Sequence, residues 1–197
     1  YCIMPTIKFN KKKFLTNYFE EFRSLIIPDD KTFEKLIKVS ELMIKTHVSK
    51  KKIMIAGNGG SAAISSHFSV DLTKNAKVRS INFNEADLIT CFANDFGYED
   101  WLSNAIKFYG DKNDLLFLVS VSGKSSNIVN AAKKAKKFGV KKIITFTGCE
   151  QNNPLKALGD INFWVNSKSY NLVENNHQFL LLSLVDLIIG KSEYKPN

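Results

Sequence analysis

The sequence predicts an α/β fold, a doubly wound five-stranded parallel sheet preceded by two helices. From residue 52 onward, short apolar runs alternate with amphipathic segments, which is the pattern of βαβ units. Two helical stretches come before the first of these runs. Two of the runs end in a Gly- or Ser-rich turn that opens a helix. We therefore expect a helical appendage over residues 1–50 and an α/β domain over residues 51–197, a length sufficient to bury a core.

The first two elements are predicted from apolar residues at three- and four-residue spacing. An aromatic-rich stripe that includes Phe14, Tyr18 and Phe19 places one helix over about residues 11–27. Such a stripe is more often core or subunit contact than a ligand site. Pro28 ends this helix, and the second begins with Asp30 or Thr32 as its capping residue.

The remaining elements follow in alternation. The apolar runs predict strands over residues 53–56, 78–82, 115–119, 142–146 and 161–165. The amphipathic segments predict helices over residues 61–74, 87–93, 99–109, 125–138, 154–158 and 170–189. The longest apolar run, residues 179–189, is too short to span a membrane and is expected to be a buried core helix.

The composition favours an anionic partner. The 28 Lys and Arg residues outnumber the 19 Asp and Glu residues, which gives a formal net charge of +9. The lysine runs, such as residues 11–13, 50–52 and 133–137, are not interleaved with aromatic residues, so we expect solvated surfaces and not a nucleic-acid site. Membrane association is not expected either.

The cysteines and the start of the chain point to the cytoplasm. Cys2, Cys91 and Cys149 are odd in number and widely spaced, which favours neither a disulfide framework nor a zinc finger. The first residues lack the charged and apolar regions of a secretory signal.

The first candidate site follows the first predicted strand. Gly57-Asn58-Gly59-Gly60-Ser61 opens a helix, and glycines there let a ligand approach the backbone amides and the positive end of the helix dipole. The string also fits the G-x-G-x-x-A dinucleotide fingerprint. That fingerprint needs an acidic residue about 20 positions on, at the end of the second strand, and Glu85 and Asp87 come too late. The motif therefore predicts an anion site and supports a nucleotide enzyme only weakly.

The second candidate site follows the third predicted strand. Four hydroxyl side chains and Lys124 lie between Ser120 and Ser126, at the start of another helix. Serine is also common as a helix cap, so this loop alone is ambiguous. No Walker string occurs. A doubly wound sheet places the two loops side by side, and together they favour a phosphorylated small molecule.

These motifs, with His67, Asp71 and Asn94-Asp95, resemble the SIS (sugar isomerase) family and within it the phosphoheptose isomerases. The resemblance covers nearly the whole chain. It implies a flavodoxin-like fold and conversion of sedoheptulose 7-phosphate to D-glycero-D-manno-heptose 7-phosphate, in synthesis of bacterial lipopolysaccharide or capsule precursors. It also implies a homotetramer with active sites at subunit interfaces and a divalent metal such as zinc.

Carried over residue by residue, the resemblance assigns most of the site. Substrate binding falls to residues of the two loops and of the segment between them: Asn58, Gly59, Gly60, Ser61, Asn94, Asp95, Ser120, Val121, Ser122, Lys124 and Ser125. Val121 stands where a threonine is usual and Lys124 where an asparagine is usual. His67 matches a metal-binding histidine, and Asp71 matches a glutamate that serves as metal ligand and catalytic base.

The last helix departs from the family pattern. The family has a glutamine and, two turns later, a histidine there; this chain has leucine at either plausible position of that histidine. His67 and Asp71 are spaced i, i+4, and Glu174 and His177 are spaced i, i+3. If the two faces meet, these four side chains could bind zinc. Asp71 or Glu174 is then the expected base and His177 the acid partner.

The missing histidine keeps a second class of function open. An SIS protein without catalysis can act as a sugar-phosphate-binding regulator or as an adaptor. A nucleotide-dependent enzyme is a third hypothesis. Binding and turnover of sugar phosphates would separate these possibilities.

Overall fold

The computed structural model describes residues 10–193, so Cys2 and the first residues lie outside the described part. The helices are α1 (Lys11–Ile26), α2 (Asp30–Val48), α3 (Gly60–Lys74), α4 (Ala86–Phe96), α5 (Trp101–Tyr109), α6 (Ser126–Ala135), α7 (Pro154–Leu158) and α8 (Tyr170–Ile189). The strands are β1 (Ile53–Gly57), β2 (Ser80–Asn82), β3 (Leu115–Ser120), β4 (Lys142–Thr147) and β5 (Ile161–Trp164). None of the helices in residues 10–193 is long and apolar enough to cross a membrane.

The five strands form one parallel sheet in the order β2-β1-β3-β4-β5. This is the flavodoxin-like order, and the predicted fold class is confirmed. The strand order reverses at β1, where Ile53 pairs with Ser80 of β2 on one side and Leu115 of β3 on the other. Every residue of β1 and β3 is buried, as expected where helices cover both faces of a parallel sheet.

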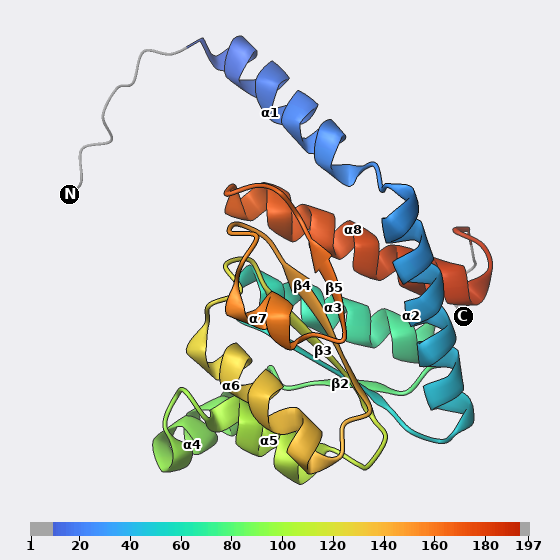
Figure 1. Ribbon diagram of the computed structural model, residues 1–197, viewed down its shortest axis with the longest axis vertical. Coiled ribbons are helices and arrows are strands. Elements are labelled where there is room, and N and C mark those ends of the chain that lie inside the picture. Colours follow the sequence, from blue (N-terminus) through green and yellow to red (C-terminus); the bar gives the residue numbers. More distant parts are fainter. Residues whose placement is uncertain (1–9, 194–197) are drawn as a thin grey trace.

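Two apolar cores lie on opposite faces of the sheet (Figure 1). On one face α2, α3 and α8 cover side chains such as Ile55 and Phe117. On the other face α5, α6 and α7 cover Met54, Leu116 and Leu118, and α4 packs beside α5. The alternation of side chains along each strand divides residues between the two cores.

Helix α1 extends away from the sheet domain (Figure 1), and none of its residues is buried. Phe14 is 53% exposed and Phe19 is 64% exposed. The end of the helix is held by Asn176, whose Nδ2 donates to the carbonyl oxygen of Leu25 at 2.6 Å. The aromatic stripe is therefore not a core within this chain.

Helix α2 behaves differently, because Leu36, Val39 and Met43 are buried in the core with α3 and α8. The capping prediction for this helix was wrong. Asp29, one residue earlier than expected, accepts from the backbone nitrogen of Thr32 at 2.8 Å, and the pKa of Asp29 is lowered by its hydrogen bonds with Thr32. The proposed division at residue 50 stays a prediction, but α2 shares the main core.

The start of β2 and the end of α6 differ from their predicted positions for local reasons. Strand β2 begins at Ser80 and not at Val78, because Lys77 has a positive φ of 58° and the Val78 nitrogen bonds back to Leu72. The helix predicted to reach residue 138 ends at Ala135 and continues as a 3₁₀ turn, which closes at a left-handed Gly139.

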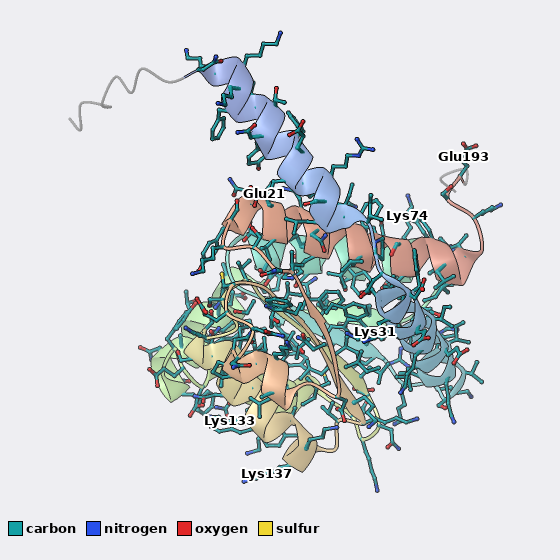
Figure 2. All side chains as sticks on the ribbon, turned by 45° about the horizontal axis from the view of Figure 1, so that its top comes forward. Glu21, Lys31, Lys74, Lys133, Lys137 and Glu193 are labelled. Carbon is teal, nitrogen blue, oxygen red and sulfur yellow. The ribbon has the colours of Figure 1, made fainter. Side chains whose placement is uncertain are left out.

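Most described lysines are solvated, as predicted, and Lys133 and Lys137 point outward in Figure 2. Lys52 is the exception. It is 7% exposed, and its Nζ lies 2.7 Å from the buried Asp114 and 2.8 Å from Asp111. This ion pair fixes the start of β1 against the start of β3, because the Lys52 nitrogen also donates to Asp114.

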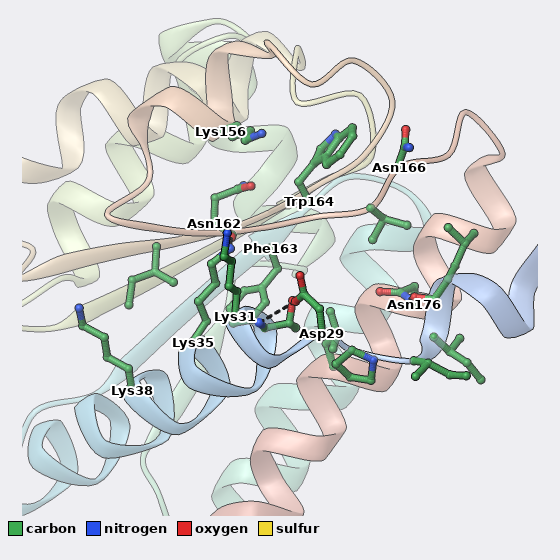
Figure 3. A pocket seen from close by; sticks show the side chains of 18 of the residues that line it. Asp29, Lys31, Lys35, Lys38, Lys156, Asn162, Phe163, Trp164, Asn166 and Asn176 are labelled. Carbon is green, nitrogen blue, oxygen red and sulfur yellow. Dashed lines mark hydrogen bonds between the residues drawn. The ribbon is translucent and has the colours of Figure 1, made fainter.

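A pocket of about 740 Å³ follows the open edge of the sheet at β5. Lys31, Lys35 and Lys38 project from α2 on one side of the strand, and Lys156 and Trp164 lie on the other (Figure 3). Lys35 donates to the Asn162 carbonyl oxygen at 3.0 Å. Lysines beside an edge strand disfavour its pairing with other chains.

Candidate functional site

The two predicted phosphate loops lie at the ends of neighbouring strands. Strand β1 ends at Gly57, which is in register with Val119 of β3. The loop after β1 opens α3, and the loop after β3 opens α6. The strand order reverses between β2 and β3, so the loops border the switch point where open α/β sheets bind ligands.

The first loop is shaped by its glycines. Gly57 packs so closely on α3 that an added β-carbon would lie 2.7 Å from the Ser61 backbone. Gly59 has a positive φ of 54° and open space beside it. Among the described residues no side chain caps α3, and the nitrogens of Gly60 and Ser61 at its start make no backbone hydrogen bond, so these two amides are available to an anion.

The second loop carries three serine hydroxyls, two of which lie close together. Ser120 Oγ and Ser125 Oγ lie 3.4 Å apart, and Ser122 Oγ accepts from the Lys124 nitrogen. Lys124 is exposed beside them. Ser125 occupies the capping position of α6 without a capping bond from its side chain. The hydroxyls and the first amides of α6 form a cradle suited to phosphate oxygens.

Val121 of the same loop faces the interior. Its side chain is 4% exposed and packs with Val165 and Val173. Its carbonyl oxygen accepts from the Gly148 nitrogen at 2.8 Å. A role for Val121 in substrate binding is therefore restricted to its backbone nitrogen.

A pocket of about 350 Å³ between α3 and α8 adjoins the first loop and is lined by His67, Glu174 and Gln178, among others. The Glu174 carboxylate lies against Gly60, where an added β-carbon would collide with it. A carboxylate is favoured at this position by the positive end of the α3 dipole. Gly60 is therefore needed for close approach of Glu174.

The predicted pairing of His67 with Asp71 is present. His67 Nε2 lies 3.4 Å from Asp71 Oδ2. On the other side of the ring, Gln178 Nε2 lies 3.4 Å from His67 Nδ1. Sequence reasoning missed Gln178, although it is spaced i, i+4 from Glu174 and so shares its face.

The prediction that His177 joins Glu174 at the site was wrong. His177 is completely buried, its Nε2 lies 3.1 Å from the Thr147 carbonyl oxygen, and its ring packs edge-on against Phe146. Burial lowers its pKa to about 4. Because Nδ1 has no hydrogen-bond partner, a second proton on the ring would be unsatisfied. His177 is a neutral core residue and not an acid partner.

The four-ligand metal site is not assembled within this chain. Among residues 10–193, no three His, Cys, Asp or Glu side chains converge to hold one ion. His67 and Asp71 lie together and Glu174 lines the adjacent pocket, whereas His177 faces β4. The donors of one chain do not fit the zinc site that the resemblance implies.

Asn94 and Asp95 lie away from this pocket, at the exposed end of α4 on the opposite face of the sheet (Figure 1). Asn94 Nδ2 donates to Asp95 Oδ1 at 3.0 Å. The structure of one chain does not bring them to Glu174 and His67.

The chain matches a family model described as SIS domain over residues 17–148. It is 34% identical to phosphoheptose isomerase of Helicobacter pylori (strain Shi470) over 153 residues, which is 75% of this chain and 79% of that protein. It is 31% identical to phosphoheptose isomerase of Buchnera aphidicola over 90% of this chain and 96% of that one. A solved phosphoheptose isomerase from Francisella tularensis has a TM-score of 0.83 at 23% identity, covering 93% and 100% of the two chains.

The burial of His177 predicts a pH dependence of stability. With an unperturbed pKa of 6.5 and a folded pKa of about 4, this histidine contributes stability above pH 6.5 that is lost as the pH falls through 4. The stability lost in this way is about 3 kcal/mol at most.

Replacing His177 tests this assignment. When the pH is lowered from 7 to 4.5, we expect the free energy of unfolding to fall less in His177→Gln than in the unmodified protein, as measured by urea unfolding. His47→Gln, on the exposed end of α2, is the control. Identical pH dependence in the His177 variant would contradict the assignment.

Proposed function

The chain belongs to the SIS domain family and to its phosphoheptose isomerase group, and from this premise we propose how it acts as a sugar-phosphate isomerase. The substrate is sedoheptulose 7-phosphate and the product is D-glycero-D-manno-heptose 7-phosphate. The observation that carries the proposal is the pair of helix N-termini without side-chain caps that follow the neighbouring strands β1 and β3, the first of which borders the Glu174 pocket. We place the activity in the cytoplasm, in synthesis of precursors for lipopolysaccharide or another surface glycan.

Binding of the phosphate falls to neutral groups. Ser120, Ser122 and Ser125 supply hydroxyls, and the first turns of α3 and α6 supply amides and the positive ends of their dipoles. Lys124 adds one positive charge at the rim. The open chain of the sugar then extends toward Gly60 and Glu174.

Isomerisation moves one proton between neighbouring carbons. A base removes a proton from C1 of the ketose, giving an enediol, and a proton is returned to C2, while a hydroxyl proton passes from O1 to O2. A carboxylate beside the substrate carbons suits this role. No redox partner is needed, because the electrons stay within the sugar.

Glu174 is the stronger of the two predicted candidates for the base. It lines the pocket and reaches the first loop, whereas Asp71 contacts His67 and accepts from Asn75 Nδ2 at 3.1 Å, one helical turn farther from that loop. Asp71 also raises the pKa of Asp186 on α8, after the larger effect of burial. We propose Glu174 as base, and His67 as the histidine that borders the sugar.

The expected zinc ion is not part of this proposal, because the described donors do not converge. The proton transfer from C1 is assigned to the Glu174 carboxylate. A bound divalent ion, if present in the assembled protein, would polarise the sugar oxygens.

We also propose that the chain assembles as a homotetramer with α1 at its centre. The exposed aromatic stripe on α1 needs a partner outside the chain, since none of its residues is buried. Asn94 and Asp95 face outward on α4, so a neighbouring subunit could bring them to a substrate.

Replacing Glu174 tests the proposed chemistry. We expect Glu174→Gln to lower kcat by about 10²–10⁴-fold, because the amide cannot accept the C1 proton. Turnover of sedoheptulose 7-phosphate is followed by NMR, with Glu41→Gln on the exposed face of α2 as control. Activity within a few-fold of the unmodified protein would rule out Glu174 as base. Tight binding of sugar phosphate by the unmodified protein without turnover would favour a regulator.

A charged substitution in the aromatic stripe of α1 tests the proposed tetramer. We expect Phe19→Glu to convert the tetramer into smaller species, because burying the new carboxylate between helices is costly. Thr16→Glu, on the polar side of α1, should leave the mass unchanged. Light scattering with size exclusion measures both. A tetramer that survives Phe19→Glu would place the subunit contact elsewhere.

A further inference from the structure

A pair of asparagine side chains joins the two phosphate loops. Asn58 Nδ2 donates to Asn127 Oδ1 at 2.9 Å, and Asn127 Nδ2 donates to Asn58 Oδ1, also at 2.9 Å. Asn58 belongs to the loop after β1, and Asn127 lies in the first turn of α6, 69 residues later. The two amides therefore form a closed ring of two hydrogen bonds across the switch point.

The environment makes this pair rigid. Asn127 is 1% exposed, and a buried amide that loses its partner is left with unpaired polar groups. If either amide turned over, nitrogen would face nitrogen and oxygen would face oxygen, so each side chain fixes the orientation of the other. Asn58 is half-buried, and it keeps one N–H and one oxygen lone pair beyond the ring.

The Asn58–Asn127 pair lies between the N-termini of α3 and α6, whose separation matters for binding one phosphate. The backbone oxygen of Asn58 accepts from Ala62 in the first turn of α3, and Asn127 follows the Ser125 capping position of α6. Movement of either loop would separate the amides of the two helix N-termini. A phosphate held by both loops requires these groups at a fixed separation.

We propose that Asn58 and Asn127 form a clamp that positions the two loops as one phosphate site. Their main role is positioning, and neither side chain needs to touch the reacting carbons. The inference rests on the proposed sugar-phosphate function. It goes further because it gives a role to Asn127, to which the sequence analysis assigned none. It also makes Asn58 a positioning residue, where the resemblance implied a substrate-binding one.

A double-mutant cycle tests the clamp. Binding of sedoheptulose 7-phosphate and of inorganic phosphate is measured by calorimetry for Asn58→Ala, Asn127→Ala and the double variant. We expect each single variant to bind both ligands about tenfold less tightly than the unmodified protein. The double variant should bind them as tightly as the single variant with the lower affinity, because either change alone already opens the ring. For Asn58→Ala, KM should rise while kcat stays within about threefold.

The control is Asn130→Ala, one turn later on α6, where the side chain donates to the Glu99 carbonyl oxygen. It should leave phosphate binding within about twofold, even if its thermal stability falls. If Asn127→Ala does not fold, the half-buried Asn58→Ala decides the question alone through its KM and its phosphate affinity.

Three results would overturn the clamp: single variants that bind phosphate as well as the unmodified protein, single effects that multiply in the double variant, or an unmodified protein that binds neither ligand. If the unmodified protein binds inorganic phosphate but does not isomerise the sugar, the proposed function fails. The cycle with inorganic phosphate still tests the clamp in that case.

Discussion

Parallel pairing of β1 with β3 is the constraint on which this site depends. Parallel neighbours cannot be joined by a short hairpin, so each returns through a helix, and both strands end at the same edge of the sheet. The strand order reverses at β1, so the loops leaving β1 and β3 border one crevice. The helices that follow direct their N-termini toward that crevice, so the proposed phosphate site can rely on serines and amides although the protein is rich in lysine.

The same architecture places the other predicted site residues on opposite faces of the sheet. Glu174 and His67 lie on the α3 and α8 side of the sheet, whereas Asn94 and Asp95 lie on α4 across the sheet. A single chain thus presents two partial sites. Together with the exposed stripe on α1, this division supports the proposed homotetramer, because a second copy could supply the groups that one chain keeps apart.

Local patterns in the sequence were sufficient for the strands, most helices and the positions of the two loops after β1 and β3, since buried runs and Gly- or Ser-rich turns are local signals. Local patterns failed where the position of a side chain depends on residues far away in the sequence. Residues 174 and 177 differ by about 60° around a helix, and only the packing of α8 shows that Glu174 faces α3 while His177 faces β4. Lys52 is buried because Asp111 and Asp114 fold back onto it, and Asn127 meets Asn58 only after β1 and β3 pair.

The central claim is that the two loops form one phosphate site. A crystal structure of the protein with sedoheptulose 7-phosphate tests it most directly. We expect phosphate oxygens within hydrogen-bond distance of Ser120, Ser122 or Ser125, with the sugar reaching toward Gly60 and Glu174. Phosphate bound instead among the lysines of the β5-edge pocket, with both loops empty, would contradict it.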